Sequence, residues 1–155
     1  LKGPTLFKGY FCGGILNRVK DKNGFYHTGD LGEKTKKGTL RVFGRKDNMF
    51  ISGGENIQAE EVENVLLKHK AVEKAMVLKK QSLEFGHRPV AVIKFRNEKE
   101  NPNLNEFLKT KIAGFKRPVE YYRWPENESK CLKDSRVLMQ KMFKDEGLIR
   151  FNNQC

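Results

Sequence analysis

The sequence predicts an α+β fold, in which helices cover a small three-stranded sheet that follows a β-hairpin. Short apolar runs rich in β-branched residues, such as Val90–Phe95, alternate with stretches whose apolar residues recur at helical spacing. Glycine, proline and asparagine separate these runs and mark the turns between them. At 155 residues the chain is long enough for one domain, or for a small domain and a piece of another.

The chain is strongly basic. Its formal net charge of +12, from 31 Lys and Arg against 19 Asp and Glu, attracts anions of any kind. The lysines are scattered, and neither a nucleic-acid-binding motif nor a basic stripe with interleaved aromatic residues is present. We therefore expect no nucleic-acid partner, and a solvated surface that favours small polyanions.

Cysteine usage and hydropathy bear on location. The three cysteines, Cys12, Cys131 and Cys155, are odd in number and follow no metal-ligand spacing. They fit a reducing compartment. No signal peptide is visible, and the longest apolar runs are too short to span a bilayer. We expect a cytoplasmic protein with no membrane partner and no metal ligands in this chain.

The first third of the chain reads as extended structure with turns. Asp21–Gly24 is a turn signal, and the segment Phe25–Asp30 (FYHTGD) follows it. Lys36–Gly38 predicts a hairpin turn, after which Thr39–Phe43 has the composition of a strand.

The stretch Gly44–Glu63 (GRKDNMFISGGENIQAEEVE) combines several unusual features. An apolar run at Met49–Ile51 leads to Gly53 and Gly54, two adjacent glycines that allow positive φ and close approach to a ligand or to another segment. Asn56 is the predicted N-cap of the helix that follows. The buried stripe of that helix is predicted to comprise Val62, Val65 and Leu66. Spacing alone also fits a plain glycine loop before a helix.

Two strands and a helix are predicted next. Val72–Leu78 and Val90–Phe95 have strand composition. Asn101 before Pro102 predicts the start of a helix, and Gly114 predicts its end.

The chain then returns to a third strand and a last helix. Pro118–Trp124 predicts the strand, and Asp134 or Ser135 is the expected cap of the helix. An apolar stripe is expected on that helix, comprising Leu138, Met139, Met142 and Phe143. The tail from Gly147 is expected to be loosely held.

Three segments together resemble a known family. The central pattern GRxDxxxxxGGExIxxxEVE resembles the hinge and glycine loop of the adenylate-forming superfamily, which includes acyl-CoA synthetases, adenylation domains and luciferases. Thr28-Gly29-Asp30 and the opening GPxxxxGY resemble motifs late in its large domain, and the resemblance extends from Gly3 to about Phe143. It implies that residues 1–46 are the β-rich end of that large domain, whose remainder lies upstream, and that residues 47–155 are its small C-terminal domain.

The resemblance also implies roles for individual residues. Asp30 and Arg45 would bind the ribose of ATP or AMP, and a carboxylate can accept hydrogen bonds from both ribose hydroxyls. Asp47 would be the hinge about which the small domain rotates between two catalytic poses. Gly53 and Gly54 would line the tunnel through which the pantetheine of CoA reaches the reaction centre.

A lysine near the C-terminus completes the implied site. Lys133 and Arg136 match the family's KxxR motif, in which the lysine bridges the acyl carboxylate and an ATP phosphate. The glycine that usually precedes the lysine is replaced by Leu132, and Lys130 lies close by as an alternative.

The implied reaction has two steps. A carboxylic acid and Mg-ATP give an acyl-adenylate and pyrophosphate, and the CoA thiol then forms the acyl-CoA and releases AMP. The Mg²⁺ ligands are expected outside this chain, so the chain alone is expected to be inactive. Glu84–Val92 and Phe115–Val119 narrow the resemblance to a bacterial acid–CoA ligase of the menaquinone pathway. The alternatives are another fatty- or aryl-acid CoA ligase and a free-standing basic binding module.

Overall fold

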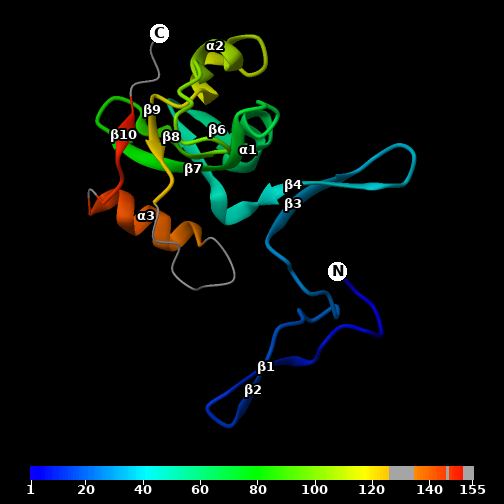
Figure 1. Ribbon diagram of the computed structural model, residues 1–155. Helices are drawn as coiled ribbons and strands as arrows, with labels where there is room; N and C mark the ends of the chain where they lie inside the picture. The colour runs from blue at the N-terminus through cyan, green and yellow to red at the C-terminus, as the bar shows by residue number, and fades with distance from the viewer. Residues whose placement is uncertain (126–134, 146, 152–155) are drawn as a thin grey trace. The chain divides into compact units, whose positions relative to one another are not determined.

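The computed structural model describes residues 1–125, 135–145 and 147–151. The chain divides into two compact units, Leu1–Lys46 and Asp47–Cys155, and Figure 1 traces the elements of both.

The first unit consists of two antiparallel hairpins. β1 (Gly9–Cys12) pairs with β2 (Ile15–Arg18), and β3 (Asp30–Lys34) pairs with β4 (Leu40–Arg45). The turn predicted at Lys36–Gly38 is confirmed, since Gly38 has a φ of 82° and Thr35 N donates to Thr39 O. Many apolar side chains of these strands are exposed, including those of Tyr10, Phe11, Ile15, Leu16, Leu40 and Val42.

The second unit contains the buried core of the described residues. Its main sheet has four strands in the order β10-β9-β8-β7. They are β7 (Val72–Ser82), β8 (Gly86–Phe95), β9 (Glu120–Arg123) and β10 (Arg150–Phe151). β8 and β9 run parallel, which requires the crossover connection that contains α2 (Leu104–Lys109) and the short 3₁₀ helix η2 (Gly114–Lys116).

Three further elements precede the sheet. They are the short 3₁₀ helix η1 (Lys46–Asn48), the hairpin of β5 (Met49–Ser52) with β6 (Glu55–Gln58), and α1 (Ala59–Leu66). α3 (Arg136–Lys144) precedes β10.

Helices cover both faces of this sheet, because successive residues of a strand point to opposite faces. Val77 and Ile93 pack with α1 and α2 through Leu66 and Leu104. Residues of β7 and β8 that point to the opposite face pack instead with Met139 of α3. They are Met76, Leu78, Val90 and Val92. Figure 1 shows α1 and α2 on one side of the sheet and α3 on the other. The predicted α+β class is confirmed.

The sheet has one strand more than predicted. Phe151 is the register partner of Tyr121, and its ring lies 5.4 Å from that of Phe95. Leu148 is buried against the sheet as well. The expectation of a loose tail from Gly147 is therefore wrong for residues 147–151, which apolar burial and strand pairing fix in place.

The predicted helix starts need two corrections. Asn56 is not an N-cap, because it lies within β6 opposite Ile51. The cap position of α1 is Gln58, whose side chain makes no capping bond. α2 starts later than predicted, since Asn103 rather than Asn101 accepts the capping bond, from Glu106 N at 3.0 Å.

The end of α2 and the start of α3 lie closer to their predicted positions. α2 ends at Lys109, before Gly114, which instead opens η2. Ser135 caps α3 as predicted, and its Oγ accepts a hydrogen bond from Leu138 N at 3.4 Å. Met139 of the predicted stripe is buried, whereas the Leu138 side chain is exposed.

Two adjacent leucines at the end of α1 test this packing. Leu66 is fully buried and Leu67 is 44% exposed. Leu66→Ala should lower the free energy of unfolding by about 2–5 kcal/mol, because it removes buried methyl groups and leaves a cavity. Leu67→Ala should change it by less than about 0.5 kcal/mol. Urea unfolding of the 155-residue chain measures both, and equal effects would contradict this packing.

Candidate functional site

The first unit places Asp30 and Arg45 opposite each other. They are register partners across β3 and β4, and Arg45 Nη1 lies 3.5 Å from Asp30 Oδ1. Arg45 Nη1 also donates to the carbonyl oxygen of Thr28. Both charged side chains remain nearly half exposed, so the pair is oriented by the hairpin and still accessible to a ligand.

Gly29 makes this arrangement possible and was missed by the sequence reasoning, which assigned no role to it. Its φ is 77°, and a Cβ placed there would lie 2.9 Å from Nη2 of Arg45. Lys46 N donates to Gly29 O, and Asp30 N donates to Thr28 Oγ1, so the Thr28–Asp30 turn wraps closely around the guanidinium. The Thr-Gly-Asp motif itself was the signal that could have identified this glycine.

A hollow of about 350 Å³ adjoins Asp30 within the same unit. Its lining comprises Leu1, Tyr26, His27, Thr28, Gly29, Asp30 and Lys46. A hydrogen bond with Tyr10 raises the pKa of the Tyr26 hydroxyl, and a tyrosine hydroxyl is protonated at neutral pH even without such a shift. The hollow thus offers a hydroxyl, a carboxylate and an ammonium group to a polar ligand.

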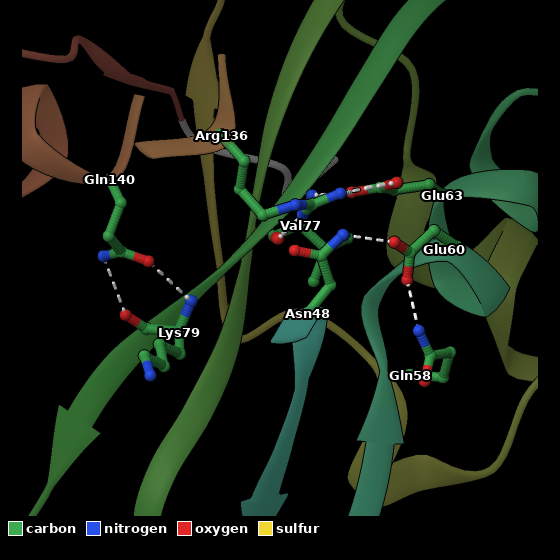
Figure 2. Close-up of polar contacts among 8 residues, drawn as sticks. All are labelled: Asn48, Gln58, Glu60, Glu63, Val77, Lys79, Arg136 and Gln140. Carbon is green, nitrogen blue, oxygen red and sulfur yellow. Dashed lines mark hydrogen bonds and ion pairs between the residues drawn. The ribbon is translucent and has the colours of Figure 1, made fainter. Parts of the chain in front are cut away.

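The residue that follows the predicted hinge is tied to α1. Asp47 lies in η1, and Asn48 donates through Nδ2 to one carboxylate oxygen of Glu60. The other oxygen of Glu60 accepts from Gln58 Nε2, as Figure 2 shows. Asn48 is consequently held to the first turn of α1.

The two central glycines form the turn between β5 and β6, where their environments differ. Both have positive φ, 58° at Gly53 and 85° at Gly54, as a two-residue hairpin turn of type I′ requires. Gly53 N donates to Phe85 O at 3.0 Å, and a Cβ on Gly53 would lie 3.0 Å from the Phe85 ring. Apart from its chain neighbours, no atom of the described residues lies within 4 Å of a Cβ placed on Gly54, so that side of the turn is open in the described part of the chain.

The predicted catalytic lysine, Lys133, and its alternative, Lys130, both lie outside the described residues. Arg136 of the same motif is described, at the start of α3. Its Nη2 lies 2.8 Å from Oε1 of Glu63 on α1, and its Nη1 donates to the carbonyl oxygen of Val77. Arg136 therefore faces the protein interior.

Neither a metal site nor a membrane span is evident in the described ranges. Among these residues, His, Cys, Asp and Glu side chains nowhere cluster in threes as a metal ion would require. None of the helices in the same ranges is long and apolar enough to cross a bilayer.

Residues 61–130 match the family of AMP-binding enzyme C-terminal domains. This stretch therefore matches a domain of that family, and the predicted resemblance to adenylate-forming enzymes is confirmed. Within the superfamily its similarity is to 2-succinylbenzoate–CoA ligases. It is 42% identical over 139 residues to that enzyme of Haemophilus influenzae, a match that covers 88% of this chain and 30% of the relative. The chain thus spans about a third of the length of the curated relatives it matches.

Solved structures of o-succinylbenzoate CoA synthetases are similar to this chain as well. The chain is 36% identical to MenE, the o-succinylbenzoate CoA synthetase of Bacillus subtilis, in complex with the acyl-adenylate intermediate OSB-AMP. That similarity has a TM-score of 0.71 and covers 87% of this chain and 30% of the other. A second structure of the same enzyme, in complex with ATP and a magnesium ion, has a TM-score of 0.67 at 34% identity and covers 79% and 26% of the two chains.

The different surroundings of Gly53 and Gly54 give a stability prediction. Alanine at either position is forced into the left-handed region, at a cost of about 1–2 kcal/mol. Gly53→Ala should cost more than Gly54→Ala, because its Cβ also meets the Phe85 ring. In a Phe85→Ala background the difference between the two glycine variants should shrink, which a double-mutant cycle of urea unfolding measures. An unchanged difference would exclude Phe85 as the cause.

Proposed function

We propose that this chain is the C-terminal part of an AMP-forming o-succinylbenzoate–CoA ligase of menaquinone biosynthesis. The observation that carries the proposal is its similarity to one ligase over about nine tenths of the chain. The Asp30–Arg45 pair on the first unit adds a geometry suited to a nucleotide ribose. The acid, Mg-ATP and CoA would be substrates of the whole enzyme, whose remaining domain would supply the acid pocket and the Mg²⁺ ligands.

In the first step the carboxylate of the acid attacks the α-phosphate of Mg-ATP, and pyrophosphate leaves. Asp30 accepts hydrogen bonds from the ribose hydroxyls, while Arg45 is oriented by Asp30 and Thr28 and donates to the same sugar. Lys133 offsets the negative charge that develops between the carboxylate and the phosphates.

In the second step the CoA thiol attacks the carbonyl carbon of the acyl-adenylate, and AMP leaves with the electrons of the broken C–O bond. A rotation about Asp47 would bring the Gly53–Gly54 turn to the reaction centre. Because Asn48 is fixed to Glu60, the backbone torsions that change lie before Asn48. The open side of Gly54 leaves room for the pantetheine.

A cytoplasmic location belongs to the same proposal. Cys12 is an exposed free thiol, a state that a reducing compartment preserves.

The first test uses full-length enzyme with o-succinylbenzoate, ATP and CoA. Lys133→Ala should reduce pyrophosphate release at least a hundredfold, the loss expected when one preorganised charge is removed from the transition state. Thioester formation from pre-made acyl-adenylate should survive. Lys130→Ala is the matched control and should leave both steps nearly unchanged.

Three results would revise the proposal. Turnover of a different acid, with none of o-succinylbenzoate, would change the substrate and keep the ligase class. Loss of adenylation in Lys130→Ala alone would move the role to Lys130. Absence of adenylation with every acid would overturn the ligase assignment.

The tunnel role of the turn is tested by Gly54→Ala. Gly38 offers a matched control, because its φ of 82° resembles the 85° of Gly54 and a Cβ placed there also meets no non-adjacent atom within 4 Å in the part of the chain that is described. Gly54→Ala should lower thioester formation from acyl-adenylate about tenfold or more and leave pyrophosphate release within twofold, since a methyl group obstructs a narrow passage. Gly38→Ala should change neither step. Equal effects of the two variants on both steps would contradict the tunnel role.

A further inference from the structure

The free edge of the main sheet is occupied by side chains. β7 is the last strand in the order β10-β9-β8-β7, so one side of it has no strand partner among residues 1–125, 135–145 and 147–151. Such an edge presents N–H and C=O groups that need other partners. On β7 the outward groups include those of Val77 and Lys79.

Three side chains bind these groups, as Figure 2 shows. Val77 N donates to Glu63 Oε1 at 2.6 Å, and Val77 O accepts from Arg136 Nη1. Gln140 serves both groups of Lys79, because its Oε1 accepts from Lys79 N at 3.3 Å and its Nε2 donates to Lys79 O at 3.1 Å. Two of the three side chains, Arg136 and Gln140, come from α3.

The spacing of the two elements matches. Arg136 and Gln140 lie four residues apart on α3, a rise of about 6 Å along the helix. Val77 and Lys79 lie two residues apart on β7, a rise of about 6.6 Å along the strand. The contacts therefore specify one register between α3 and β7, and displacing the helix by a single residue would break both of them.

Of the two contacts that α3 makes with β7, the one made by Arg136 is the more constrained, because Arg136 also forms an ion pair with Glu63. Arg136 Nη2 lies 2.8 Å from Oε1 and 3.1 Å from Oε2 of Glu63, whose side chain is only 11% exposed. Removing one member of such a pair leaves the other charge poorly solvated. Nη1 and Nη2 of Arg136 thus both have partners within the fold.

We propose that Glu63, Arg136 and Gln140 form a clamp that fixes the start of α3 on β7 and thereby positions Lys133 for adenylation. The inference rests on the proposed function, in which Lys133 acts in the first step. Lys133 precedes Arg136 by three residues in the sequence, so the clamp residue nearest to the lysine is Arg136. Arg136 is thus a positioning residue of the KxxR motif.

The two half-reactions should depend on this clamp to different degrees. A misplacement of about 1 Å at a reacting group can cost a hundredfold in rate. The adenylation step uses Lys133 and would suffer from it. The thioester step would use the Gly53–Gly54 turn, which makes none of the clamp contacts described above.

The experiment uses full-length enzyme and measures the half-reactions separately, as pyrophosphate release and as acyl-CoA formation from pre-made acyl-adenylate. Arg136→Gln should lower the first at least tenfold and leave the second within twofold. Gln140→Ala removes the other contact of α3 with β7 without changing any charge, and it should lower pyrophosphate release a few-fold. It replaces Arg136→Gln in the test if that variant does not fold. Glu106→Gln is the control, because it removes an exposed ion pair with Lys109 on α2, and it should affect neither step.

The outcomes separate the two proposals. If the wild type forms no acyl-adenylate with any acid, the proposed function fails, and this inference fails with it. If the wild type is active and the folded clamp variants slow both steps equally, or slow neither, the positioning role alone is overturned. A selective loss of adenylation in Arg136→Gln or Gln140→Ala supports it.

Discussion

The second unit depends on how the edge of its sheet is satisfied. β7 is the longest strand in the described chain, and both of its faces are covered by helices, yet its outer side has no neighbouring strand. Glu63 reaches that side from α1, and Arg136 and Gln140 reach it from α3. Because α1 and α3 pack on opposite faces, the Glu63–Arg136 ion pair passes around the edge and joins the two layers. The polar contacts thus prevent α3 from sliding along the strand, a movement that apolar packing alone would allow.

The two candidate binding features are built on comparable local geometry. In each, a glycine with positive φ lies against a side chain from a distant part of the sequence, Gly29 against Arg45 and Gly53 against Phe85. A β-carbon at either position would push that partner away. The backbone at these two glycines therefore determines where a guanidinium and an aromatic ring are placed.

The fold class and the positions of most helices and strands could be predicted from the sequence, because the spacing of apolar residues that identifies a strand or a helix is a local property. The four-stranded sheet did not, since β10 has only two residues and is recognisable only by the partner it finds on β9. Asn56 failed as a cap because pairing with Ile51 outweighed a local capping preference. Asp30 and Arg45 were recognised through the motifs and lie together as ribose-binding groups would need to. The contacts of Arg136 with Val77 and Glu63 span 59 and 73 residues and could not be inferred from any local pattern.

The exposed apolar strands of the first unit have a consequence for handling this chain in solution. Phe11 is 76% exposed and Ile15 is 67% exposed, on a molecule with a formal charge of +12. Repulsion between like-charged copies opposes contact between such surfaces, and its range falls from about 10 Å in 0.1 M salt to about 3 Å in 1 M salt. We therefore expect electrostatic repulsion to keep the chain dispersed in dilute buffer and concentrated salt to promote clustering.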